Sequence, residues 1–118
     1  MKVFHKHRIY QFISFASLSL IVLLSGCSTL KIGRDFDMQV FESMVKVGET
    51  TKSQVMTKIG SPKSTGVAMN MEGERMQEWV YFYASGQLPG MKDTRLKLLQ
   101  MRFDQNGILR SYNWSNSE

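Results

Sequence analysis

Residues 76–83 read Met-Gln-Glu-Trp-Val-Tyr-Phe-Tyr, and this stretch decides the fold. Its aromatic and β-branched side chains favour an extended backbone. Because successive side chains of a strand point to opposite faces, Trp79, Tyr81 and Tyr83 share one face. Aromatic side chains bury a large area, so we expect these three to fill the core rather than to form a peptide-binding stripe. The stretch is therefore predicted to be a strand with one buried face.

Further alternating stretches on both sides of this strand predict an antiparallel meander. Residues 65–71 alternate between apolar and small or polar side chains, and a Glu-Gly-Glu turn follows them. Residues 95–103 alternate in the same way, and the Asp-Gln-Asn-Gly sequence after them predicts a hairpin turn into residues 108–114. The stretch from 84 to 94 contains two glycines and a proline, so we expect an exposed loop there.

Two short helices are predicted ahead of the strands. Asp37 can cap the first helix, because apolar side chains with helical spacing follow it. These side chains are Val40, Phe41, Met44 and Val45. Thr51 and Gln54 fit a capping box for a second helix, which the Gly-Ser-Pro sequence after Ile59 ends. We therefore predict that residues 37–118 form an α+β domain, with two N-terminal helices packed on a three- to four-stranded antiparallel sheet.

Residues 1–26 have the charge order of a secretory signal, in which basic residues precede an apolar stretch. This stretch, Ile9–Leu24, is shorter than the roughly 18 to 20 apolar residues that a spanning helix needs. It leads into Leu24-Ser25-Gly26-Cys27, which resembles a lipobox. In that motif the cysteine thiol receives a diacylglyceryl group, the peptide bond before it is cut, and the new amine is acylated. We therefore expect the signal to be cleaved; the alternative is that Cys27 is an ordinary residue beside an uncleaved anchor.

The lipid on Cys27 would determine where the protein resides. Several acyl chains hold a domain on a bilayer, whereas one chain binds only marginally. Residues 27–36 are short, polar and contain a glycine, so we predict a lipidated tether there. In such lipoproteins an aspartate after the cysteine favours retention in the inner membrane. Here Ser28 and Thr29 follow the cysteine, so we expect the protein in the outer membrane, with the domain facing the periplasm.

The composition of the mature chain limits the classes of function that it can have. Removal of the signal leaves 92 residues, enough for one small domain. The signal carries three of the fifteen basic residues and none of the ten acidic ones, so the net charge falls from +5 to +2 and nucleic-acid binding loses its main support. Both histidines lie in the signal, which excludes histidine-based catalysis. We expect no enzyme activity, no small-molecule substrate, and no cofactor besides the diacylglycerol and N-acyl chain on Cys27.

Several short motifs in the mature chain occur in a recognisable order. They are Gly48-Glu49-Thr50-Thr51-Lys52, Ile59-Gly60-Ser61-Pro62, Trp79-Val80-Tyr81 and Leu99-x-x-x-Phe103-Asp104-x-x-Gly107-Ile108-Leu109. In this order, behind a lipobox, the chain resembles the SmpA/OmlA family of lipoproteins over residues 40–109. The family includes a small subunit of the outer-membrane β-barrel assembly machinery, so the resemblance implies two helices on a three-stranded sheet and envelope proteins as partners. The chain departs from that subunit in a longer segment between Pro62 and Trp79, and in Ala84, where a basic residue ends the subunit's first strand.

Two groups of residues are candidates for partner binding. Tyr112 and Trp114 lie near the chain end, where they are either exposed for a partner or packed on the sheet edge. Lys92, Arg95 and Arg102 surround the predicted loop and the strand after it, where they could meet an acidic partner or anionic head groups. The alternative for these basic residues is an ordinary solvated sheet face.

The sequence thus predicts a non-enzymatic outer-membrane lipoprotein that binds envelope proteins. The expected role is an accessory in outer-membrane protein assembly or envelope integrity. A second hypothesis is an inhibitor or immunity-type lipoprotein that blocks one periplasmic enzyme or toxin, with residues 64–75 as the inserted hairpin. Methionines in and near that hairpin either adapt to a partner or fill gaps in the core.

Overall fold

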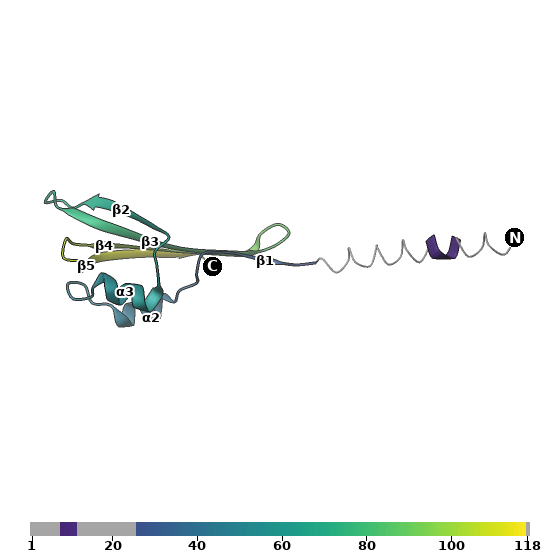
Figure 1. Ribbon diagram of the computed structural model, residues 1–118, viewed down its shortest axis with the longest axis horizontal. Helices are drawn as coiled ribbons and strands as arrows, with labels where there is room; N and C mark the ends of the chain where they lie inside the picture. The colour runs from purple at the N-terminus through teal and green to yellow at the C-terminus, as the bar shows by residue number, and fades with distance from the viewer. Residues whose placement is uncertain (1–7, 12–25, 118) are drawn as a thin grey trace.

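The computed structural model describes residues 8–11 and 26–117, and Figure 1 labels its elements. Five strands form one antiparallel sheet: β1 (Thr29–Ile32), β2 (Ser64–Met69), β3 (Arg75–Gln87), β4 (Lys92–Phe103) and β5 (Leu109–Ser117). Two short helices, α2 (Met38–Met44) and α3 (Lys52–Ile59), lie between β1 and β2 in the chain. Within the described ranges, no helix has both the length and the apolar character needed to cross a bilayer.

The predicted α+β class, with two N-terminal helices packed on a three- to four-stranded sheet, is wrong. The chain is mostly β, with five strands, and α2 and α3 have only seven and eight residues. One reason is β1, which forms inside the segment predicted to be a tether. The other is that β3 and β4 continue through most of the predicted loop, which leaves only residues 88–91 between them.

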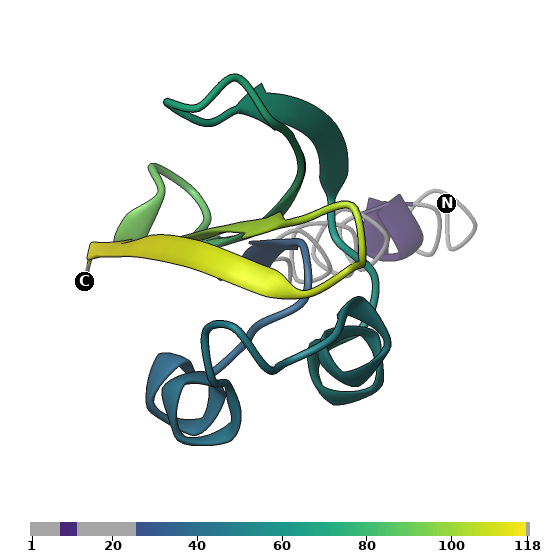
Figure 2. The same cartoon turned by 90° about the vertical axis from the view of Figure 1, so that its left-hand side faces the viewer.

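Strand β3 organises the sheet. Its first half pairs with β2 and its second half pairs with β1, so these two strands share one edge of β3, while β4 pairs along the other edge. Strand β5 adds to the outer edge of β4. Figure 2 shows both helices on one side of the sheet and the β2–β3 hairpin curving over the other side. We call these sides the helix face and the open face.

The core lies between the helices and the helix face. Phe41 and Val55 point into it from α2 and α3, and Trp79, Tyr81 and Tyr83 are buried beneath them, as predicted. From β4 and β5, the core receives Leu99, Met101, Phe103 and Leu109. The Trp79 ring packs against Phe103 with ring centroids 4.9 Å apart. Period-two alternation in β3 and β4 therefore supplies most of the buried surface.

The predicted caps are confirmed at both helices. Asp37 accepts a hydrogen bond from the Val40 backbone at 3.1 Å, and Thr51 and Gln54 exchange the two bonds of a capping box. The hydroxyl of Tyr81 donates to the carbonyl of Gly60 at 2.7 Å, which fixes the end of α3 on the sheet. Burial raises the pKa of Tyr81 to about 12.

Truncation of Leu99 tests the position of the core. This side chain is fully buried in the centre of β4, so Leu99→Ala should lower the free energy of unfolding by about 2–5 kcal/mol, because it leaves a cavity. The matched control is Val67→Ala on β2, where the side chain is exposed and the expected change is below about 0.5 kcal/mol. Urea unfolding of both variants measures the difference. If both variants lost the same free energy of unfolding, Leu99 would not lie in the core.

Candidate functional site

The end of the sheet beside Cys27 is the first candidate site. Cys27 is exposed with a free thiol, and Gly26 before it is exposed as well. The other lipobox positions, Leu24 and Ser25, lie outside the described residues, as does most of the predicted signal. Immediately after Cys27, the carbonyl of Ser28 accepts a hydrogen bond from the Leu88 amide at 2.8 Å. The residue directly after the predicted lipid attachment point is therefore already hydrogen-bonded to the β3–β4 turn.

The segment predicted as a tether, residues 27–36, is docked on the sheet rather than free. Lys97 holds its second half, because its ammonium group donates to an Asp35 carboxylate oxygen at 2.8 Å and to the Phe36 carbonyl at 3.1 Å. The same ammonium lies 5.9 Å from the centre of the Tyr83 ring. The side chain of Phe36 is itself buried in the core. The short, polar sequence that predicted flexibility becomes ordered through contacts with residues distant in the chain.

Tyr112 and Trp114 both lie on β5 on the helix face, but their surroundings differ. The Tyr112 ring packs edge-on against Phe41 with ring centroids 5.3 Å apart. Partial burial, followed by the nearby negative charge of Glu42, raises the pKa of Tyr112. The indole of Trp114 is 43% exposed, and its Nε1 donates to the Glu42 carboxylate at 3.0 Å. Tyr112 is thus mainly a packing residue, whereas Trp114 presents a fixed aromatic surface to solvent.

The three basic residues predicted to bind a partner lie at different places on β4. Lys92 and Arg95 lie at the start of β4, whereas Arg102 lies near its end and on the opposite face of the sheet. Seven residues of a strand span about 23 Å. Arg102 is also paired with the carboxylate of Glu78 on the neighbouring strand, at 3.0 Å. Strand alternation therefore separates Arg102 from Arg95, and a role of these basic residues in partner binding stays a prediction.

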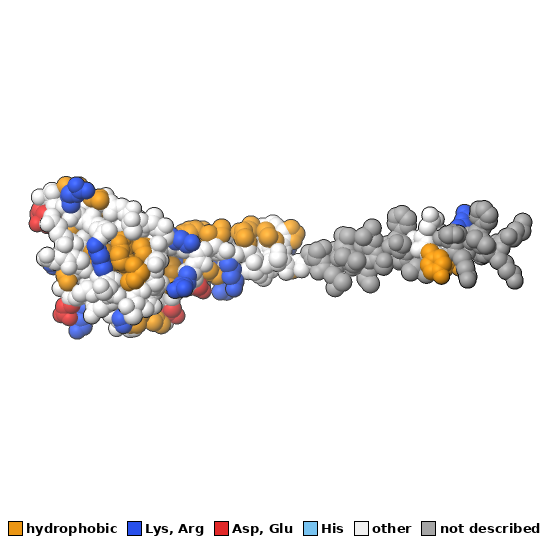
Figure 3. Space-filling model, viewed as in Figure 1, with side chains coloured by type: hydrophobic (Ala, Val, Ile, Leu, Met, Phe, Trp, Pro, Cys, Tyr) orange, Lys and Arg blue, Asp and Glu red, His pale blue; other side chains and the backbone are white. Residues whose placement is uncertain are grey.

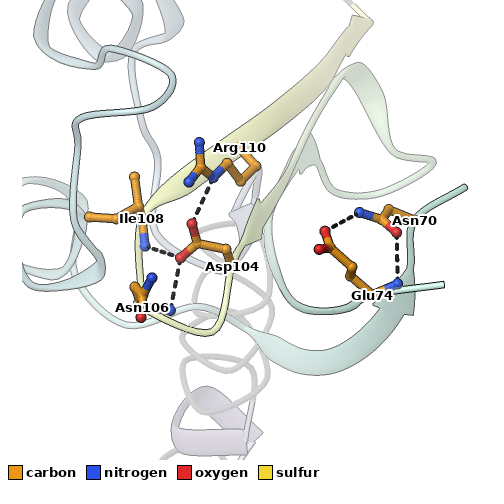
Figure 4. A network of polar contacts seen from close by, with 6 residues as sticks. All are labelled: Asn70, Glu74, Asp104, Asn106, Ile108 and Arg110. Atoms are coloured by element: carbon orange, nitrogen blue, oxygen red, sulfur yellow. Dashed lines mark hydrogen bonds and ion pairs between the residues drawn. The ribbon is translucent and has the colours of Figure 1, made fainter. Parts of the chain in front are cut away.

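A polar pocket of about 630 Å³ lies between the tip of the β2–β3 hairpin and the β4–β5 turn. Figure 4 shows both ends of it. At the turn, Asp104 accepts bonds from the Asn106 and Ile108 amides at 2.9 and 3.0 Å and from Arg110 Nε at 2.7 Å. At the hairpin tip, Asn70 and Glu74 exchange two bonds of 2.8 Å. Sequence reasoning found both turns but missed the pocket, because only the curvature of β2 and β3 brings them together.

The described residues contain no group of three or more histidine, cysteine, aspartate or glutamate side chains placed to hold a metal ion. Comparison with known proteins gives no match: no family model, curated protein or solved structure is similar enough to assign this chain to a family. The resemblance to the SmpA/OmlA family therefore stays a prediction from the sequence.

The Asp104 turn predicts a measurable acid sensitivity. The Ile108 amide, with the Arg110 side chain and the Asn106 amide, lowers the pKa of Asp104 from its ordinary 3.8, and these bonds outweigh a smaller opposing effect of desolvation. The stabilisation is therefore complete above that ordinary value and is lost as the pH falls through the lower, folded-state pKa.

We expect Asp104→Asn to flatten the acid limb of a plot of unfolding free energy against pH. Urea unfolding from neutral to strongly acidic pH measures the slope. Glu72→Gln, at the exposed tip of the other hairpin, serves as the control and should keep the slope of the parent protein. An unchanged slope in Asp104→Asn would contradict the role of this carboxylate.

Proposed function

We propose that this protein is a non-enzymatic, lipid-anchored lipoprotein of the outer membrane that faces the periplasm and binds other envelope proteins. The observation that carries this proposal is the half-exposed indole of Trp114, held in place by Glu42. A tryptophan accounts for binding energy more often than most residue types. An indole that is already fixed loses little side-chain entropy when a partner covers it. An accessory role in outer-membrane protein assembly or envelope integrity rests further on the motif order shared with SmpA/OmlA lipoproteins.

Lipid attachment at Cys27 would strengthen binding without any new contact. A domain confined to the membrane surface meets membrane-bound partners at a high effective concentration. The exposed position of Cys27, directly before Ser28, whose carbonyl is hydrogen-bonded to Leu88, supports this arrangement. The lipid would supply the location, and Trp114 would supply contact energy.

The β2–β3 hairpin favours a second candidate function, inhibition of one periplasmic enzyme or toxin. Val67, Met69 and Met71 are exposed along it, and Met71 is fully so. Methionine side chains adapt readily to the shape of a partner surface. The hairpin could then act as an inserted element. A single soluble protein recovered with the lipoprotein would favour this function over membership of a membrane complex.

Substitution of Trp114 separates binding from folding. The protein is purified from membranes in mild detergent, and co-purifying proteins are quantified by mass spectrometry. Trp114→Ala should weaken partner recovery by about tenfold or more, the range expected for an aromatic hot spot. The neighbouring Ser115→Ala, also exposed on β5, should keep recovery unchanged. A Trp114→Ala protein that has lost its cooperative thermal transition would instead assign this indole to the core.

Substitution of Cys27 tests the anchor. Cys27→Ala should move the protein from the outer-membrane fraction to the soluble fraction or leave it uncleaved, since no acyl chain can be attached. Cell fractionation, with the mass of the mature N-terminus, measures both effects. Ser28→Ala is the control and should leave membrane association intact. If Cys27→Ala is processed normally and remains in the outer membrane, the lipid anchor is excluded.

A further inference from the structure

One face of the sheet is apolar at the end beside Cys27. Paired residues of antiparallel strands share a face, and here Ile32, Ala84 and Leu96 form a row across β1, β3 and β4. The next row on the same face pairs Phe82 with Leu98. These rows lie on the open face, away from the helices (Figure 2). No helix of the described chain covers this part of the sheet.

This apolar surface is exposed in the structure. Leu30, Ile32 and Leu96 are 40%, 48% and 41% exposed. Met91 extends the surface over Gly86, where a Cβ would come within 2.7 Å of its terminal methyl carbon. Figure 3 shows hydrophobic side chains gathered along the side of this end away from the helices, with lysine and arginine side chains on the other side. We call this surface, formed by Leu30, Ile32, Phe82, Met91, Leu96 and Leu98, the apolar platform.

The opposite face of the same strands is cationic. Lys31 pairs with Ser85, which pairs with Arg95, so both basic side chains lie on the helix face. Lys97 follows on that face and is already bound to Asp35. The end of the sheet is therefore amphipathic, with an apolar open face and a cationic helix face that stays in water when the open face is buried.

Chain connectivity identifies what covers the apolar platform. Ser28 is hydrogen-bonded to Leu88 in the β3–β4 turn, and consecutive Cα atoms are about 3.8 Å apart. A lipid on Cys27 thus enters the bilayer within one residue of the sheet. We infer that the apolar platform rests on the surface of the same bilayer and forms a second membrane contact beside the lipid. This inference depends on the proposed lipidation of Cys27.

The second contact would fix the orientation of the domain. Lipid chains alone allow a domain to rotate about its attachment point, whereas a lipid and an adjoining apolar surface define a plane. With the open face of this end on the bilayer, α2, α3 and Trp114 point away from the membrane, because they lie on the helix face. The surface proposed to bind partners would then be presented to the periplasm.

Fluorescent labels on adjacent residues test this contact. Leu96→Cys places a label on the apolar platform, and Arg95→Cys places the same label one residue away on the opposite face, as the matched control. Each full-length lipoprotein is labelled with an environment-sensitive fluorophore and reconstituted in phosphatidylcholine vesicles that contain a nitroxide-labelled phosphatidylcholine. The label at 96 should shift to shorter wavelength and be quenched by the nitroxide, whereas the label at 95 should keep the emission it has in water. Thermal melts establish that both variants fold.

The outcomes separate this inference from the proposed anchor. A lipidated protein that floats with the vesicles but has a water-like label at 96 overturns the membrane contact and leaves the anchor intact. An unlipidated protein with a water-like label overturns both. A shielded label at 96 that shows energy transfer between copies, without nitroxide quenching, means that a second copy covers the platform and also overturns the inference.

Discussion

Pairing along strand β3 is the constraint on which the rest of this structure depends. Its 13 residues use both edges: β2 and β1 divide one edge between them, and β4 takes the other. Its alternation also sends Trp79, Tyr81 and Tyr83 into the core while Phe82 and Ala84 line the open face. Because side chains reverse face with every residue, a one-residue slip would exchange the buried aromatics with the residues of the open face. The core, the apolar platform and the position of Trp114 on β5 all follow from this register.

The same strand explains how the proposed lipid at Cys27 would be joined to the domain without a linker. The second half of β3 extends past the helices and pairs with β1, the strand that closely follows Cys27 in the chain. The Ser28 to Leu88 bond and the ion pair of Lys97 with Asp35 then hold both ends of the N-terminal segment on the sheet. An anchor placed at Cys27 would therefore transmit the orientation of the membrane directly to the sheet.

Sequence reasoning was most reliable where structure depends on neighbouring residues. The alternation in residues 76–83 and 95–103 predicted the buried faces, and Asp37, Thr51 and Gln54 predicted the caps, because strand faces and capping bonds depend on near neighbours in the chain. It failed where partners are distant. The four residues of β1 carry no strong strand signal and become a strand only by pairing with β3, and Gly86 resembled a loop residue although it lies under Met91. Lys92, Arg95 and Arg102 could be predicted as exposed, but their distribution over two faces required the register of β4.

Amide hydrogen exchange on the full-length protein reconstituted in vesicles tests most directly whether the end of the domain beside the proposed anchor, Cys27, is part of the sheet. The amide of Leu88 and the β1 amides that pair with β3 should exchange as slowly as those in the centre of the β3–β4 pair. We expect this because β1, the Leu88 turn and the β3–β4 pair would open together as one cooperative unit. Rapid exchange at Leu88 and throughout residues 29–32, with protection retained in β3 and β4, would mean that the segment after Cys27 is a free tether. That result would contradict the rigid connection from Cys27 to the sheet.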